Sequence, residues 1–211
     1  MQLDHVSYAV NTSELADTVQ RLGSELGAAF IDGGRHPRFG TRNFILPLAG
    51  GSYIEVVSPL DHPAAEAAPF GQAVRQAAEA GGGWMGWAVR VDDLAPHETV
   101  LGRDAGIGHR VRPDGVDVHW RQLGVLDLLN DPAMPFFIRW DDDSEHPSMG
   151  ADSAIAIEQV CISADETSLS SWLGAEAPTL LTSLNVCFVD EEDAGLASIK
   201  FTTPHGVVTI D

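Results

Sequence analysis

The order of elements that the sequence predicts repeats three times along the chain: one strand, one helix and then three short strands. In the first round, residues 3–10 alternate in polarity as a strand does, and Asn11–Glu14 offers helix-capping residues. An apolar pattern at helical spacing follows, formed by Leu15, Val19, Leu22 and Leu26. Strand-like runs then follow at 28–32, 42–48 and 52–58, separated by glycine and proline clusters. This βαβββ order predicts an α+β fold built from a repeated unit.

The second and third repeats account for the rest of the 211-residue chain. The second has a strand at 86–94 that runs into a helix, and strand candidates at 107–112, 116–123 and 134–140. The third has a strand at 157–163, a short helix at 168–173 and strand candidates at 180–189, 196–203 and 206–210. The spacing predicts paired modules over 1–150, made of a first module (1–66), a connecting helix (67–83) and a second module (84–150). A third, smaller βαβββ-like module over 151–211 is expected to pack on the same core.

The charge balance argues against two classes of partner. The chain has 12 basic and 31 acidic residues and a net charge of -19, which repels nucleic acid backbones and anionic membrane surfaces. Residues 151–211 hold only Lys200 against ten acids, so an anionic ligand should bind in the first part. We therefore expect a small-molecule ligand, no nucleic acid and no membrane, and the sequence leaves a homodimer open.

Two further features bear on the compartment. No stretch approaches the roughly 20 apolar residues of a membrane-spanning helix, and the N-terminus lacks a basic segment followed by an apolar one. Cys161 and Cys187 lack Cys-x-x-Cys spacing, which gives little support to a zinc or redox motif. These observations predict a cytoplasmic protein.

The run 33–43 is the first candidate binding element. It packs three arginines, a histidine and an asparagine around glycines, and such polar groups are costly to bury. Arg35, His36, Arg42 and Asn43 are the candidate ligand contacts, and the alternative is a loop whose arginines are solvated.

Aligning the repeats identifies which positions correspond. Matching 10–12 with 91–93 places Gly86 where the first module has His5. Matching Asp61-His62-Pro63 with Glu145-His146-Pro147 pairs Glu55 with Arg139, or with Ile138 after a one-residue slip. A carboxylate beside an imidazole fixes its tautomer and raises its basicity, so His5 and Glu55 are candidate catalytic residues.

Several motifs resemble those of the glyoxalase-like branch of the vicinal oxygen chelate (glyoxalase/bleomycin resistance/dioxygenase) superfamily. They are Leu-Asp-His at 3–5, Gly-Gly-Arg-His-Pro at 33–37, Gly-Thr-Arg-Asn at 40–43, Tyr-Ile-Glu at 53–55, Gly-Trp-Ala-Val-Arg at 86–90, Arg-Pro-Asp-Gly-Val at 112–116 and Pro-Phe-Phe-Ile at 135–138. The resemblance implies tandem βαβββ modules that form a curled mixed sheet around a shared cavity. In metal-dependent members, the first and last strands of each module supply ligands for a divalent ion that binds vicinal substrate oxygens.

Carried onto this chain, the resemblance makes His5 and Glu55 candidate metal ligands but leaves the second module without any. Gly86 and Arg139 or Ile138 cannot hold a metal, and a catalytic divalent site usually needs three protein ligands. His119 is the best candidate for a third ligand or a substrate contact, with Arg121 on the same strand. Arg139 could instead pair with Glu55 or hold a substrate carboxylate. We therefore favour a cavity that holds no divalent metal over a cavity that holds one.

Three functions fit these features. One is a glyoxalase-like lyase or isomerase that acts on a small oxygenated, anionic molecule, with His5 or Glu55 as proton shuttle and Arg35, Arg42 and Arg139 orienting the substrate. Another is a metal-free protein that binds or sequesters a small molecule without catalysis. The third is an interaction role for the acidic third module. The sequence also predicts that Arg139 lies close to Glu55.

Overall fold

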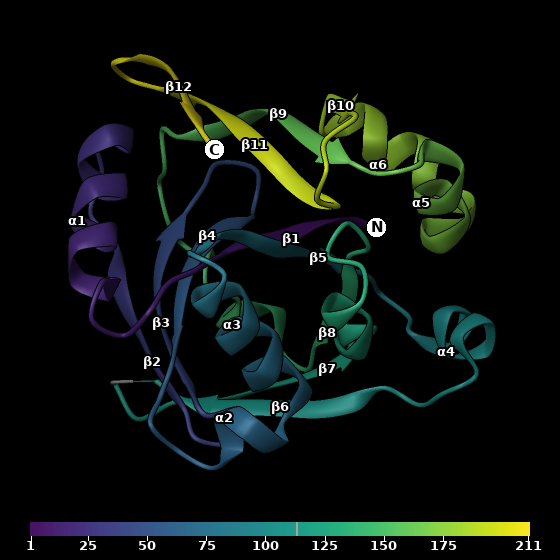
Figure 1. Cartoon of the computed structure of the whole chain (residues 1–211), viewed down its shortest axis with the longest axis horizontal. Coiled ribbons are helices and arrows are strands. Elements are labelled where there is room, and N and C mark those ends of the chain that lie inside the picture. The colour runs from purple at the N-terminus through teal and green to yellow at the C-terminus, as the bar shows by residue number, and fades with distance from the viewer. Residues whose placement is uncertain (113) are drawn as a thin grey trace.

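The computed structural model describes residues 1–112 and 114–211, and it contains two sheets (Figure 1). The larger sheet has eight strands in the order β2-β3-β4-β1-β5-β8-β7-β6. Its strands are β1 (Gln2–Ala9), β2 (Ile31–His36), β3 (Thr41–Pro47), β4 (Tyr53–Pro59), β5 (Gly83–Arg90), β6 (Gly106–Val111), β7 (Asp117–Leu123) and β8 (Phe136–Trp140). The smaller sheet has the order β10-β9-β11-β12. It comprises β9 (Ala156–Ser163), β10 (Val186–Val189), β11 (Gly195–Thr203) and β12 (Gly206–Ile210).

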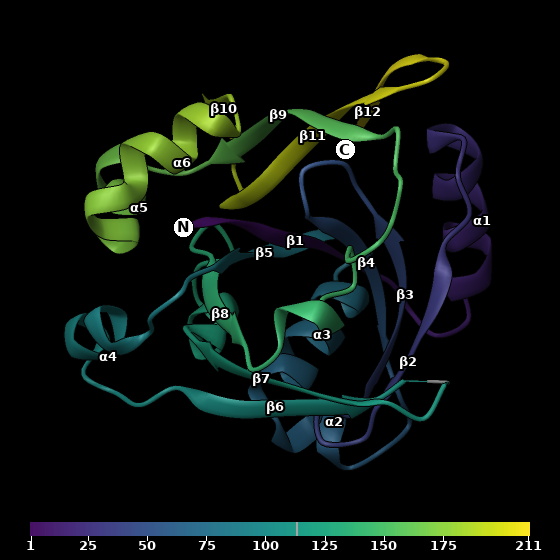
Figure 2. The same ribbon diagram turned by 180° about the vertical axis from the view of Figure 1, so that it is seen from behind.

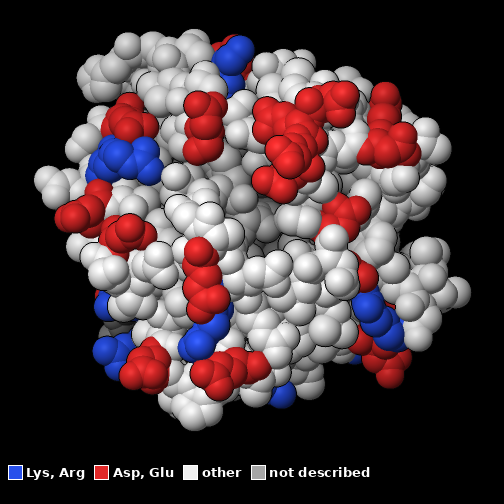
Figure 3. All heavy atoms as spheres, in the orientation of Figure 1, with Lys and Arg blue, Asp and Glu red and all other residues white. Residues whose placement is uncertain are grey.

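Short helices connect these strands. They are α1 (Leu15–Leu26), α2 (Ala64–Ala67), α3 (Pro69–Glu79), α4 (Ala95–Leu101), α5 (Glu166–Leu173) and α6 (Ala177–Ser183), with 3₁₀ turns η1 (Val125–Leu129), η2 (Asp143–Glu145) and η3 (Gly174–Glu176). α1 forms because its apolar residues share one face, and Leu15, Leu22 and Leu26 are buried there. None of the helices in residues 1–112 and 114–211 is long and apolar enough to cross a membrane. Acidic side chains are spread over the face of the molecule shown in Figure 3, with fewer basic ones among them.

The eight-stranded sheet consists of two modules with the same strand pairing. In each, the first strand pairs in parallel with the last, as β1 does with β4 and β5 with β8. The two modules join where β1 and β5 pair antiparallel. The sheet curls until its edge strands lie side by side, where Arg110 of β6 donates from Nη1 to the Gly33 carbonyl of β2 at 2.6 Å. The predicted α+β fold of βαβββ modules around a cavity is confirmed.

The four-stranded sheet lies beside the part of the curled larger sheet where β1 and β5 pair, and β6 lies on the far side of that curled sheet (Figures 1 and 2). Trp84 of β5 donates to the Ile210 carbonyl of β12 at 2.9 Å and packs against Phe201 of β11. Residues of both sheets form one apolar cluster. Strand order differs from that of the first two modules, because β9 lies between β10 and β11.

Two segments differ from the sequence-based prediction. The strand expected at 28–32 is β2 at Ile31–His36, so the glycine-rich run is mostly strand, and the turn is confined to residues 37–40. The strand expected at 180–189 begins only at Val186, because α6 occupies Ala177–Ser183 with Ala177 and Leu180 buried. A short apolar run cannot be distinguished as helix or strand from its periodicity alone.

Gly40 closes the turn between β2 and β3. Its φ is 66°, and a Cβ there would lie 2.2 Å from the Ala65 backbone nitrogen. Only glycine fits this conformation and this close approach to α2 without strain. The turn therefore pairs β2 with β3 in a register that sets Arg35 opposite Arg42 and His36 opposite Thr41.

Candidate functional site

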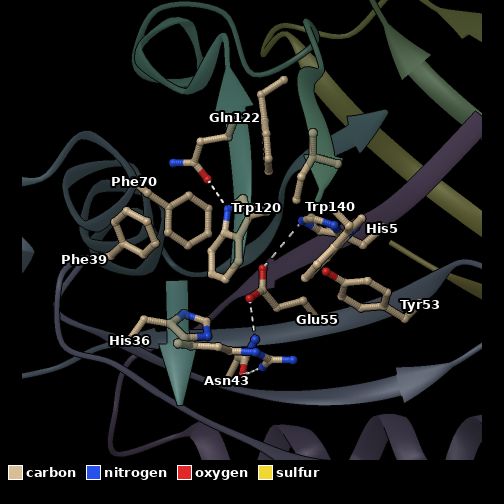
Figure 4. Close-up of a pocket in the computed structure, with 13 residues that line it drawn as sticks. His5, His36, Phe39, Asn43, Tyr53, Glu55, Phe70, Trp120, Gln122 and Trp140 are labelled. Carbon is tan, nitrogen blue, oxygen red and sulfur yellow. Dashed lines mark hydrogen bonds and ion pairs between the residues drawn. The ribbon is translucent and has the colours of Figure 1, made fainter. Parts of the chain in front are cut away.

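A small pocket of about 40 Å³ lies inside the curled eight-stranded sheet. Seven of the sheet's strands, the β2–β3 turn and α3 contribute its lining. The lining residues are His5, His36, Phe39, Asn43, Tyr53, Glu55, Phe70, Arg110, Trp120, Gln122, Phe136, Ile138 and Trp140. Aromatic rings form much of the wall, and a few polar groups converge on it, which is typical of small-molecule sites. Figure 4 shows Glu55 between His5 and Asn43.

Asp4 anchors the pocket from behind. The register of β1 against β5 shifts between Leu3 and His5, and such a bulge re-aims side chains. The fully buried Asp4 carboxylate accepts hydrogen bonds from His5 Nδ1 at 2.6 Å, Trp140 Nε1 at 2.8 Å and His146 Nε2 at 3.1 Å. Burial alone would raise the pKa of Asp4, but the His146 and His5 hydrogen bonds outweigh it and hold that pKa well below its usual range. Asp4 is therefore a carboxylate.

These contacts determine the tautomers of two histidines. His146 Nδ1 accepts from the Ser148 backbone N–H at 3.2 Å, which leaves Nε2 as the donor to Asp4. His5 donates from Nδ1 to Asp4, so the neutral ring keeps its lone pair on Nε2. The His5 ring is stacked on Tyr53 with centroids 4.7 Å apart, and its Nε2 lies 4.0 Å from Glu55 Oε2. His5 is thus held as an oriented proton acceptor.

Glu55 lies on β4, where alternation turns it to the same side as Tyr53. It is buried, and its two oxygens accept separate hydrogen bonds, from Asn43 Nδ2 at 2.6 Å and from Ser7 Oγ at 2.8 Å. Two donors stabilise the buried carboxylate. Asn43 in turn receives a long contact of 3.5 Å from Arg110 Nη1 at its Oδ1 atom.

His36 presents a nitrogen that has no partner. Its Nδ1 lies 3.2 Å from Thr41 Oγ1, whereas the buried Nε2 has no hydrogen-bond partner among residues 1–112 and 114–211. Burial, aided by the charge on Arg110, lowers the pKa of His36 to about 4. The ring is therefore neutral at pH 7, and Nε2 is available to a bound ligand.

We expect His36 to make folding stability depend on pH. Its pKa is about 4 in the folded protein and 6.5 without perturbation, so over this range the unfolded chain takes up a proton that the folded chain does not. The free energy of unfolding should therefore fall by about 3 kcal/mol as the pH drops through this interval. Urea unfolding of His36→Gln across the same interval should show that loss removed, while the exposed His62→Gln keeps it. An unchanged slope in His36→Gln would contradict the prediction.

Arg110 is the pocket cation that the sequence-based reasoning missed. Its side chain is 4% exposed and lies between β2 and β6. Burial lowers the pKa of Arg110, while Tyr53 and Glu55 oppose that shift, and a guanidinium keeps its charge. Alternation along the predicted strand 107–112 places Arg110 on one face with Gly108, but only the packing of the Trp120 ring against Gly108 shows that this face is the interior.

The predicted contact between Arg139 and Glu55 is wrong. Phe136, Ile138 and Trp140 of β8 line the pocket, so the alternating Arg139 points to the other face of the sheet. Arg139 is exposed and lines a separate surface hollow with Arg90 and Asp92. It cannot replace a metal ligand or hold a substrate in this pocket.

Other predicted contacts also lie on the outer face of the sheet. Arg42 pairs with Asp32 at 3.2 Å, and Arg35 is exposed. His119 pairs with Asp117 at 3.2 Å, and Arg121 lies 3.6 Å from Glu98. On β7 the residues that face the pocket are Trp120 and Gln122 instead. Of the predicted site residues, the structure brings together His5, His36, Asn43 and Glu55.

The second module contributes apolar groups where a metal would need ligands. The β1–β4 register pairs Ser7 with Glu55, and the β5–β8 register pairs Ala88 with Phe136. Ser7 and Ala88 each lie two residues beyond the aligned positions His5 and Gly86, so Phe136 is the counterpart of Glu55, rather than Arg139 or Ile138. A Cβ at Gly86 would lie 2.8 Å from the end of the Leu128 side chain, which packs against this glycine where the first module has His5.

The donor set does not fit a divalent ion. His5 and Glu55 are two ligands, and both Glu55 oxygens already accept hydrogen bonds. Within the described part of the chain, no group of three or more His, Cys, Asp or Glu side chains is placed to hold a metal. A catalytic divalent site usually needs three such ligands.

Several groups in or behind the pocket were not predicted from the sequence, because their roles depend on contacts between distant strands. Trp140 and His146 meet Asp4 across the sheet. Burial and the nearby Asp4 and Glu55 carboxylates raise the pKa of Tyr53 well above its ordinary value, so its hydroxyl stays protonated. The motif Leu-Asp-His contained a signal for Asp4, since an acid beside a strand histidine can orient the ring.

The first of three similar solved structures supports the fold. A hypothetical protein from Staphylococcus aureus is 16% identical, with a TM-score of 0.59 over 100% of this chain and 85% of that chain. Methylmalonyl-CoA epimerase from Mycobacterium tuberculosis is 18% identical, with a TM-score of 0.42 over 66% of this chain and 86% of that chain. A variant of the Streptomyces coelicolor methylmalonyl-CoA epimerase, in complex with 2-nitronate-propionyl-CoA, is 14% identical. Its TM-score is 0.42 over 66% of this chain and 93% of that chain.

Comparison at the sequence level identifies the family. No curated protein matches the chain significantly. The family described as glyoxalase-like domain matches residues 3–177, which include both modules of the eight-stranded sheet and the start of the third. The chain belongs to the glyoxalase-like domain family.

Proposed function

We propose that this protein catalyses proton transfer at a carbon next to a carbonyl group in a small anionic molecule, without a divalent metal. The observation that carries this proposal is the line of Asp4, His5 and Glu55, in which an oriented His5 Nε2 lone pair lies at the pocket wall. Carbanion formation of this kind is the first step of both isomerase and lyase reactions, so the proposal covers either outcome.

His5 is the proton acceptor in this proposal. Asp4 holds Nδ1–H, so Nε2 is the nitrogen that removes the substrate proton. The imidazolium that results lies between the carboxylates of Asp4 and Glu55, and both stabilise its positive charge. Glu55 is the weaker candidate for the base, because Asn43 and Ser7 already donate to its oxygens.

Arg110 supports the choice of an anionic substrate. It is the cation among the residues that line the pocket, and a guanidinium can bind a carboxylate or stabilise an enolate oxygen. The free Nε2 of the neutral His36 is a second group available to a substrate oxygen. The pocket volume of about 40 Å³ favours a molecule the size of a short 2-oxo acid.

Binding without catalysis is the second candidate. The observation that favours it is the closure of the site, since the His5 and Glu55 side chains are 5% and 6% exposed. With so little of these side chains exposed, a substrate has only a narrow path to the His5 Nε2 atom. A protein that only sequesters a small anion would need Arg110 and Asn43 but no free base.

The test is solvent exchange of the methyl protons of pyruvate, the probe chosen for the 2-oxo acid class. In D₂O, loss of the methyl proton signal in NMR spectra should be about 100-fold faster with the protein than in buffer. A chelator should not change that rate. Pyruvate binding by calorimetry without faster exchange would favour sequestration, and the absence of both would contradict the substrate class.

A further inference from the structure

Two free cysteines lie directly opposite each other on neighbouring strands of the smaller sheet. Cys161 is on β9 and Cys187 is on β10, and the parallel register of these strands pairs the two residues. Both side chains are half-buried. Val160 and Ile162 on either side of Cys161 are buried in the core, so alternation turns Cys161 to the outer face of the sheet.

This placement meets the distance requirement of a disulfide. Neighbouring strands are about 4.8 Å apart, within the Cα separation of about 4.4 to 6.8 Å that disulfides span. The Cys187 thiol is also one of the groups that raise the pKa of Cys161, as expected for neighbouring thiols. Neither sulfur is committed to a strong partner, because Cys161 Sγ contacts Gln159 Oε1 only at 3.9 Å and Cys187 Sγ contacts the Phe188 carbonyl at 4.0 Å.

We propose that Cys161 and Cys187 are a reversible oxidation site that forms an intramolecular disulfide with a hydroperoxide as oxidant. The thiolate of one cysteine attacks the peroxide oxygen, which breaks the O–O bond, gives a sulfenic acid and, with a proton, releases water when the oxidant is hydrogen peroxide. The second thiolate attacks the sulfenic sulfur, forms the S–S bond and releases a second water. Two thiols lose two electrons and two protons, and the peroxide takes up both.

The surroundings of the pair set its pH dependence. Burial and the Cys187 thiol raise the pKa of Cys161, whereas Ser198 and Lys200 of β11 oppose that shift. Lys200 is the only lysine of the chain, and its Nζ lies 3.5 Å from Gln159 Oε1. Because the thiolate is the reactive form, oxidation should accelerate as the pH rises through the alkaline range.

The test is oxidation of the full chain with hydrogen peroxide at about pH 8, followed by thiol titration and mass spectrometry without reductant. Wild-type protein should lose both thiols together, with a mass lower by two hydrogen atoms and one cross-linked peptide that contains both cysteines. Dithiothreitol should restore the thiols. Disulfide formation should be about tenfold or more faster than in Cys161→Ser and Cys187→Ser, because each variant can pair only with another molecule.

Several outcomes would overturn the proposal. These are a wild-type product with no intramolecular disulfide, a product that is only an intermolecular dimer, and oxidation that stops at sulfinic or sulfonic acid. Circular dichroism of the two serine variants controls for folding. A folded single variant whose remaining thiol gains oxygen, with no intramolecular cross-link, supports the proposal.

Discussion

Replacing His5 with glutamine is expected to lower the rate of pyruvate proton exchange by about 10²- to 10⁴-fold, the usual contribution of a positioned general base. Glutamine can still donate a hydrogen bond to Asp4, but it has no basic nitrogen to accept the substrate proton. The binding constant for pyruvate should change little, because Arg110 remains in the pocket. NMR exchange rates at several pyruvate concentrations separate the two effects.

His119→Gln is the matched control for this substitution. His119 is a strand histidine beside a carboxylate, as His5 is, but it is exposed on the outer face and pairs with Asp117. Its removal should leave exchange unchanged. Equal losses in the two variants, or an unchanged rate in His5→Gln, would rule out His5 as the base. Glu55→Gln tests the role of the second carboxylate beside His5. This substitution keeps a polar side chain near Asn43 and Ser7 but removes the charge that stabilises the His5 imidazolium.

Asp4→Asn is expected to produce the largest loss of stability, about 3 to 5 kcal/mol in the free energy of unfolding. The fully buried carboxylate accepts from His5, Trp140 and His146 at once. An asparagine turns one acceptor atom into a donor, which leaves at least one of these groups facing another donor in the interior. Urea unfolding at neutral pH measures the change.

Asp32→Asn provides the control. Asp32 also pairs with a basic residue, Arg42, at 3.2 Å, but its side chain is 48% exposed. Solvent screens such a pair, so its loss should cost less than about 1 kcal/mol. If both substitutions had similar small effects, the Asp4 network would not be a structural anchor. If Asp4→Asn remained stable but also kept full exchange activity, Asp4 would not orient His5 either.

The errors in predicting the site share one origin. Alternation along a strand shows which residues share a face, but it does not show which face meets the cavity. On β7 and β8 the prediction chose the wrong set, so His119, Arg121 and Arg139 were expected inside, whereas Trp120, Gln122, Phe136, Ile138 and Trp140 line the pocket. On β4 and at the end of β2 the chosen residues, Glu55 and His36, do face it.

The sequence by itself determined the βαβββ order and the α+β class, because hydrophobic periodicity and turn residues are local signals. The tertiary structure alone decided which side of each strand became the interior. It also decided that a bulge beside Asp4 orients His5, and that closure of β6 against β2 buries Arg110. These features depend on register between strands far apart in the chain, and a shift of one residue exchanges the two faces of a strand.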